Sequence, residues 1–357
     1  MISRFGRLRV ALAAAAVAVL PAPGFAQAPN EPAAPAPKPA APRAAPRPPG
    51  NPFPPPKTAR PPATAAVAAP ASRPGVEPDL AYGAYQRGYF LTAFAEATKR
   101  ADEKSDPRSM TLLGELYSGG VGIPQDDAKA VEWYRLAAER GDRDAMFALA
   151  LFNMTGRGGL RDRTEAARLF AEAAKLGHAA AAYDLGLLYL EGQQFPQDFG
   201  RAAELFRAAS QAGSPEAQYA LATLYKDGRG VEKNEAEAAR LLAAAALAEN
   251  PDAEVEYAIA LYNGTGVAKD EARATALFRR AALRGSPIAQ NRLARIFTIG
   301  RGAPANPVEA VKWHLIAKAG GNSDPYLDKY AADQTPEVRE AAQKAARPWL
   351  AVLPPKS

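Results

Sequence analysis

Apolar and polar positions between residues 106 and 321 follow a pattern that recurs every 36 residues, six times without a gap. Each unit contains two apolar stretches with helical spacing, separated by a glycine-containing turn. The clearest column is an alanine of the second stretch, found at Ala130, Ala166, Ala202, Ala238, Ala274 and Ala310. A fixed period of about 20–50 residues is typical of a solenoid, whose units pack on their neighbours.

Each unit predicts two antiparallel helices, and capping residues mark where the first one begins. Most of these residues have side-chain oxygens that accept from free backbone N–H groups. The column reads Asp106, Asp142, His178, Ser214, Asn250 and Ser286. The helix is expected to end at a glycine, which adopts the left-handed conformation without a Cβ clash. That column reads Gly120, Gly156, Gly192, Gly228, Gly264 and Gly300.

The second helix begins at another column of caps, which reads Asp126, Asp162, Asp198, Asn234, Asp270 and Asn306. Glu165, Glu237 and Glu309 lie three residues after their caps, which predicts capping boxes. The apolar face has a small–large–large–small order, as in Ala130, Trp133, Tyr134 and Ala137. No unit can bury that face alone, so stacking is obligatory. A closing glycine ends this helix in every unit but the fourth, where Glu249 replaces it.

The two ends of the chain differ from the repeats. Arginines followed by the apolar run of residues 10–20 predict a secretory signal peptide at residues 1–26, cleaved after Ala26; an uncleaved anchor is the alternative. Residues 27–78 are rich in Pro and Ala and predict a disordered linker. Residues 79–105 resemble a degenerate capping repeat. Residues 322–350 predict two C-terminal capping helices, the second running to about Ala346, and residues 351–357 form a tail. The localisation that follows is periplasmic or secreted.

Charge and cysteine content exclude several functions. The chain has a formal net charge of +6, but the excess of positive charge lies in the first 78 positions, and residues 79–357 carry −1. This balance gives no electrostatic footprint for nucleic acid. There is no Cys, which removes disulfides, thiolate nucleophiles, Cys metal sites and lipoprotein anchoring.

Candidate catalytic chemistry is sparse. His314 takes a column of bulky apolar residues and is interpreted as a core residue, whereas His178 takes a cap position. The two lie almost four units apart and cannot share a metal, so we predict no catalytic residues, no metal and no cofactor, and no enzyme activity. Three turns read Gly-Arg-Gly, at residues 156–158, 228–230 and 300–302. Their glycines suit the turn geometry, and we expect their arginines to lie along one edge.

Three stretches carry a family resemblance: AQYALATLY at residues 217–225, GRGV at 228–231, and KAVEWYRLAAERG at 129–141. Together they resemble the Sel1-like repeat, a relative of the tetratricopeptide repeat, over residues 106–321. The resemblance implies an all-α, right-handed α-solenoid of about six 36-residue helix-turn-helix repeats with capping helices at both ends. It also implies an adaptor or scaffold, as in exported bacterial members that act in envelope signalling or assembly.

The candidate binding surface comes from columns whose residue type varies, since the fold does not dictate them. First helices line the concave face in solenoids that this chain resembles. Aromatic and arginine side chains often anchor interfaces. We therefore predict protein contacts at Tyr183, Asp184, Tyr219, Glu256, Arg292 and Arg295. The alternative for the two tyrosines is packing against the neighbouring repeat.

The function predicted from these features is a periplasmic adaptor that binds a protein segment on the concave face. Its partner would be a membrane sensor or cell-envelope machinery, with no nucleic acid and no transmembrane segment in the mature chain. Two alternatives stay open. One is a ligand-binding or hydrolytic protein related to β-lactams or glycans, and the other is a purely structural spacer.

Overall fold

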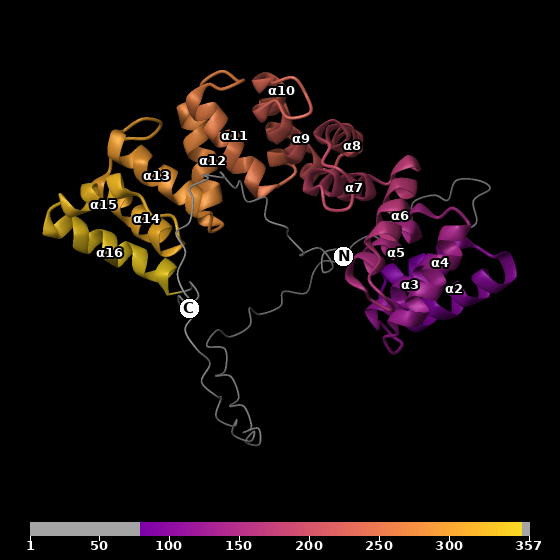
Figure 1. The fold of residues 1–357 in the computed structure, drawn as a ribbon. Helices are drawn as coiled ribbons and strands as arrows, with labels where there is room; N and C mark the ends of the chain where they lie inside the picture. The colour runs from indigo at the N-terminus through magenta and orange to yellow at the C-terminus, as the bar shows by residue number, and fades with distance from the viewer. Residues whose placement is uncertain (1–78, 352–357) are drawn as a thin grey trace, which may run out of the picture. The chain divides into compact units, whose positions relative to one another are not determined.

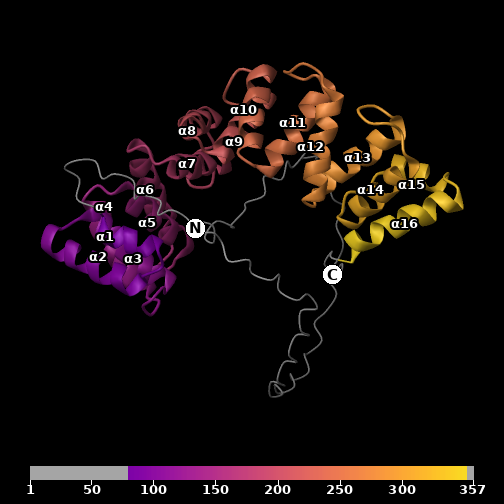
Figure 2. The same cartoon turned by 180° about the vertical axis from the view of Figure 1, so that it is seen from behind.

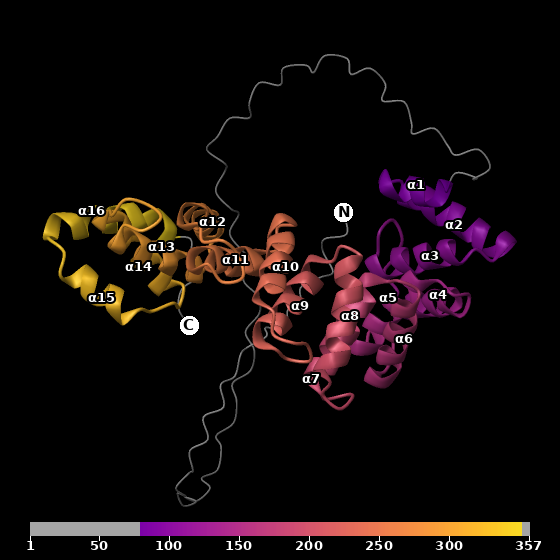
Figure 3. The same cartoon turned by 90° about the horizontal axis from the view of Figure 1, so that it is seen from above.

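The computed structural model describes residues 79–351, all within one compact unit that spans Ser72–Ser357. The predicted signal peptide, linker and C-terminal tail lie outside the described residues, apart from Ala351. The described part contains sixteen α-helices and no strand, in chain order from α1 to α16 (Figure 1). From α1 to α14, each helix packs mainly on its neighbours in the sequence, which is the pattern of an all-α solenoid. Figure 2 and Figure 3 show the same succession from behind and from above.

Six helix pairs form the repeats. The first helices of the pairs are α3 (Pro107–Gly119), α5 (Arg143–Thr155), α7 (Ala179–Glu191), α9 (Pro215–Asp227), α11 (Pro251–Asn263) and α13 (Pro287–Ile299). The second helices are α4 (Asp127–Glu139), α6 (Arg163–Lys175), α8 (Phe199–Gln211), α10 (Glu235–Leu247), α12 (Glu271–Leu283) and α14 (Pro307–Ala319). The six alanines of the column that contains Ala202 are all buried between these helices.

The predicted caps are confirmed in all twelve repeat helices, because each cap side chain accepts from the backbone N–H three residues later. His178 does this with Nδ1, 3.1 Å from the N–H of Ala181. The predicted capping boxes are wrong. The backbone N–H of Asp162 already donates to the carbonyl of Asn153 at 2.9 Å. Glu165 is therefore left to pair with Arg168, and Glu237 with Arg240.

The second glycine of each turn allows neighbouring repeats to approach closely. A Cβ at Gly230 would overlap the backbone of Phe199, where the second helix of the preceding repeat begins. A Cβ at Gly266 would overlap the carbonyl group of Glu235 in the same way. Both glycines also have φ near +69° and +68°, a conformation that L side chains rarely adopt. The third unit has Gln194 instead, whose amide donates to the Thr164 hydroxyl at 2.7 Å.

Further helices cover both ends of the repeat array. At the N-terminal end, α1 (Leu80–Gln86) packs on α2 (Phe90–Lys104), and α2 packs on α3. At the C-terminal end, α15 (Pro325–Ala332) contacts α13 and α14, and α16 (Pro336–Leu350) packs against α14. The last helix is a turn longer than predicted, and it brings Trp349 against Trp313, with ring centroids 5.5 Å apart. His314 is buried as expected, with Nε2 2.8 Å from the Asp328 carboxylate.

Glu249 occupies a left-handed conformation, with φ of 63°, where the other five units have glycine. A side chain in this region is strained by its Cβ. We expect Glu249→Gly to raise the free energy of unfolding by about 0.5–1 kcal/mol, net of the extra freedom that glycine gives the unfolded chain. Urea unfolding followed by circular dichroism measures the change. The same substitution inside a helix, Glu204→Gly, should destabilise by about 1 kcal/mol. A Glu249→Gly variant less stable than the parent protein would refute the strain.

Candidate functional site

The first helices present a row of side chains that is mostly exposed along the array. The row takes the second, sixth, ninth and thirteenth residues of each first helix, a spacing that stays on one helix face. We call its part on α5, α7, α9 and α11 the first-helix strip. Nearly all of its members are at least partly exposed, and they read Asp144, Ala148, Leu151, Thr155, Ala180, Asp184, Leu187, Glu191, Glu216, Ala220, Thr223, Asp227, Asp252, Glu256, Ile259 and Asn263.

Two of the predicted contact residues lie on α7. The ring of Tyr183 packs against Phe206 of the same repeat, with centroids 5.6 Å apart, while the tyrosine stays partly exposed. Burial, followed by the charges of Asp184 and Glu216, raises the pKa of Tyr183 to about 12. Burial alone raises the pKa of the Asp184 carboxyl to about 7. Asp184 has no cation within salt-bridge distance among the described residues, so its charge is not compensated there.

The next two predicted residues lie on consecutive first helices. Tyr219 on α9 is partly buried, and burial together with the charges of Glu256 and Asp252 raises its pKa to about 12. Glu256 on α11 forms an ion pair with Lys226, 3.0 Å away. Tyr183 also contributes to the raised pKa of Tyr219, so the charges that act on Tyr219 come from the first helices on both sides of it. The structure thus brings four of the six predicted residues together.

The remaining two residues lie on α13, beyond the strip, and have different environments. Arg292 is exposed. Arg295 donates two hydrogen bonds to Asp324, the cap of α15, at 2.7 and 3.0 Å. The Asn291 amide donates to the same carboxylate at 2.9 Å. Although burial opposes it, these hydrogen bonds lower the pKa of Asp324 to about 2. Arg295 therefore joins the C-terminal helices to the last repeat.

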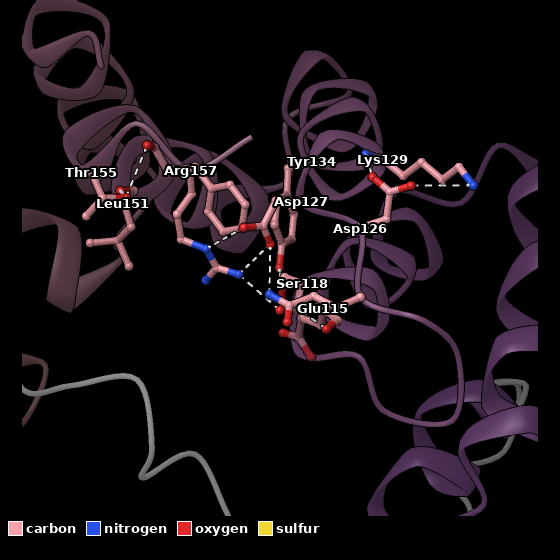
Figure 4. Close-up of polar contacts among 11 residues, drawn as sticks. Glu115, Ser118, Asp126, Asp127, Lys129, Tyr134, Leu151, Thr155 and Arg157 are labelled. Carbon is pink, nitrogen blue, oxygen red and sulfur yellow. Dashed lines mark hydrogen bonds and ion pairs between the residues drawn. The ribbon is translucent and has the colours of Figure 1, made fainter. Parts of the chain in front are cut away.

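The Gly-Arg-Gly arginines connect successive repeats. Figure 4 shows Arg157 extending from the turn after α5 to the start of α4. Its guanidinium donates to Asp127 at 2.5 and 3.0 Å and to the Ser118 carbonyl at 3.0 Å. Arg301 pairs with Glu271 in the equivalent place, and Arg229 lies over the Phe199 ring, 4.0 Å from its centroid. These contacts give the three arginines a role in packing successive repeats.

A second carboxyl with a raised pKa lies near the strip and was missed by the sequence reasoning. Glu115 on α3 takes the ninth helical position. Burial, together with the charges of Asp144 and Asp142, raises its pKa to about 7. Its column also contains Leu151, Leu187 and Ile259, so the only available signal was an acid in a mostly apolar column. Glu254 was also missed: it is fully buried on α11, 2.6 Å from Arg280.

Replacing Asp184 with asparagine is expected to change the pH dependence of stability. Between about pH 4 and pH 7 the carboxyl is protonated in the folded chain and ionised in the unfolded chain, so stability falls as the pH rises through that window. Asp184→Asn should raise the free energy of unfolding by about 1–2 kcal/mol at pH 8, which is less than the full pKa shift implies because water reaches the partly exposed side chain, and leave it unchanged near pH 4. Urea unfolding at the two pH values measures this. An equal effect at both would show that ionisation of Asp184 is not the cause.

Residues 79–351 contain neither a metal-binding cluster nor a membrane-spanning helix. No group of three or more His, Cys, Asp or Glu side chains there is arranged to hold a metal ion. Within the same residues, no helix combines the length and apolar character needed to cross a membrane.

Stacked helix pairs, glycine turns and a free row of first-helix side chains define a repeat protein of the α-solenoid class. The family model described as Sel1 repeat matches residues 107–142, 143–178, 179–214, 215–250, 251–286 and 287–322. The chain belongs to the Sel1 repeat family. Sel1 repeats form a scaffold that is typically non-catalytic, and proteins built from them generally bind other proteins.

Solved structures agree with this assignment. The chain is 28% identical to c5321, a protective antigen of uropathogenic Escherichia coli strains that displays an SLR fold, with a TM-score of 0.66. That alignment covers 75% of this chain and 61% of the antigen, so the chain spans less than two thirds of its relative. A Sel1 repeat protein from Oxalobacter formigenes is 26% identical, with a TM-score of 0.60, over 67% of this chain and 98% of that one. Among curated proteins, none matches the chain.

Proposed function

We propose that this protein is an exported adaptor that binds a segment of a partner protein along the first-helix strip. The observation that carries the proposal is the strip itself. Stacking buries much of each first helix, including Ala181 and Leu185 on α7, but it leaves the row through Asp184 and Glu256 partly exposed over four repeats. Partly exposed Tyr183 and Tyr219 border the row, and tyrosine is frequent among residues that dominate binding energy.

The length of the strip suits an extended or helical segment better than a small molecule. Four consecutive repeats contribute to it, each with side chains in equivalent places. Ligand pockets for small molecules are concave and enclose most of the ligand, whereas a row on successive helices offers repeated contacts to a chain. A protein segment is therefore the occupant that this geometry favours.

Charge reversal on the strip should abolish partner capture. Asp227→Lys with Asp252→Lys changes two exposed carboxylates that have no cation within salt-bridge distance, so folding should be retained. Cells producing the tagged chain would be cross-linked and the captured proteins quantified by mass spectrometry. We expect the double variant to lose the partners that the parent chain enriches. The matched control is Glu204→Lys with Glu232→Lys, outside the strip, which should keep them. Equal capture by both variants would refute the strip as the binding face.

Export is the second element of the proposal and rests on the arginines and apolar run of the N-terminal sequence. We expect the mature chain to begin at Gln27 and to fractionate with the periplasm or medium. Intact-mass measurement of the protein purified from cells tests this. A chain that keeps Met1 and fractionates with the cytoplasm would refute export without affecting the strip.

A further inference from the structure

The first-helix strip is strongly acidic in its central repeats. Its sixteen positions on α5, α7, α9 and α11 contain seven carboxylates and no lysine or arginine. The equivalent positions of the flanking helices include Arg108 on α3 and Arg292 on α13. On α3 the charge of Arg108 offsets that of Glu115, so the net negative charge of the row is found in the four repeats that form the strip.

Several of these carboxylates are not neutralised within the described part of the chain. Glu191 pairs with Arg163 at 2.7 Å, and Glu256 pairs with Lys226. Asp144 lies 3.8 Å from Arg143 and 3.4 Å from His178. No cation of the described residues lies within salt-bridge distance of the other four, which are Asp184, Glu216, Asp227 and Asp252. A row of uncompensated acids favours a ligand of opposite charge.

Asp184 also indicates a cationic ligand, because the repeat fold does not require an acid at this position. The equivalent positions hold Ala148 and Ala220 in the neighbouring units. Burial disfavours the ionised carboxyl, so the position destabilises the folded chain at neutral pH. The titratable group next to it is Tyr183, whose pKa responds to the charges of both Asp184 and Glu216. Neither Tyr183 nor Glu216 supplies a positive charge to offset the carboxylate.

From these observations, and building on the adaptor function proposed above, we infer that the strip binds a segment rich in lysine or arginine, and that one of its cationic side chains pairs with Asp184 between Tyr183 and Tyr219. The aromatic rings add a favourable surface for the cation and its aliphatic stem. Asp252 and Asp227, on the following repeats, would hold further cations of the same segment. Because pairing requires the ionised carboxylate, binding is tighter above pH 7 than below it, and salt weakens it.

Fluorescence anisotropy with defined peptides tests the inference. The probe is a labelled peptide of about twelve residues with lysine at every third position and Ser, Gly or Pro between. Matched peptides carry glutamate or glutamine at the same places. With the mature chain at pH 8, we expect the lysine peptide to bind and both other peptides to bind at least about tenfold more weakly. Lowering the pH to 5.5 should weaken binding of the lysine peptide by a similar factor.

Two variants separate pairing at Asp184 from general attraction. Asp184→Asn should lower the affinity for the lysine peptide about tenfold at pH 8. Because this substitution stabilises the fold at that pH, unfolding cannot explain the loss of binding. Glu204→Gln removes the same charge from the surface of α8 and should leave binding unchanged. Equal binding by the Asp184→Asn variant, equal binding of the glutamine peptide, or no binding of the lysine peptide would each overturn the inference. In the cellular capture experiment, a partner that depends on the strip but binds through a segment without Lys or Arg would also overturn this inference. The proposed adaptor function would then remain.

Discussion

Substituting alanine for Gly266 is expected to lower the free energy of unfolding by about 3 kcal/mol or more. Two effects add. The residue has φ of +68°, which costs an L side chain about 1–2 kcal/mol. Its Cβ would also overlap the Glu235 carbonyl and lie 2.8 Å from the Ala236 nitrogen. The backbone of α10 cannot yield without separating the fourth repeat from the fifth, so overpacking adds to the strain.

Gly285→Ala is the matched control for this variant. Gly285 has φ of +90°, but no atom lies within 4 Å of the position that its Cβ would take. The Gly285→Ala variant should therefore lose only the free energy that the left-handed conformation costs an L side chain, about 1–2 kcal/mol. Urea unfolding followed by circular dichroism gives both values. Equal losses would mean that close approach of the repeats is not the reason for the second glycine of the turn.

Replacing Asp324 with alanine is expected to cost about 3 kcal/mol and to loosen the C-terminal helices. The carboxylate accepts from Arg295 and Asn291, and it caps α15 through the N–H of Tyr326. Removing it deprives buried Asn291 of its partner and α15 of its cap. Because the pKa of Asp324 is lowered to about 2, this stabilisation is complete above about pH 4 and is lost as the pH falls toward 2.

Tryptophan fluorescence reports on this end of the chain, since Trp313 and Trp349 pack together between α14 and α16. The Asp324→Ala variant should show an early fluorescence change on adding urea, ahead of the loss of helical signal. Asp333→Ala, at the exposed end of α15, is the control and should behave like the parent protein. A variant at Asp324 with unaltered stability would contradict the role of this carboxylate in holding the C-terminal helices.

The sequence predicts the parts of the fold that depend on interactions within a few residues. Caps such as Asp106 and C-terminal glycines such as Gly120 act within a few residues, so the sequence alone places them correctly. The alanine column was predictable because its period is regular. Contacts between repeats are harder to predict, since they join residues about thirty positions apart. For that reason the pairing of Arg157 with Asp127 and the close approach at Gly230 emerge only from the structure.

The candidate site was predictable in part for the same reason. Variable first-helix columns include partly exposed positions such as Asp184 and Glu256, but the column of these two residues is buried at Leu112 and Ala220. The columns do not show which charges are already paired. Arg295 was expected to be free, but it is bound to Asp324 from a helix beyond the repeats. Desolvation of Asp184 likewise depends on how closely the neighbouring side chains pack, which residue spacing does not reveal.

Site-specific photo-crosslinking in cells tests the central claim most directly. A photoreactive phenylalanine analogue would replace Tyr219 beside the strip in one variant and Glu204 on α8 in another, and crosslinked proteins would be identified by mass spectrometry. We predict that the probe at position 219 captures a defined partner segment, that the probe at 204 does not, and that Asp227→Lys with Asp252→Lys abolishes the capture. The same proteins captured from both positions, or from position 204 only, would contradict binding on the first-helix strip.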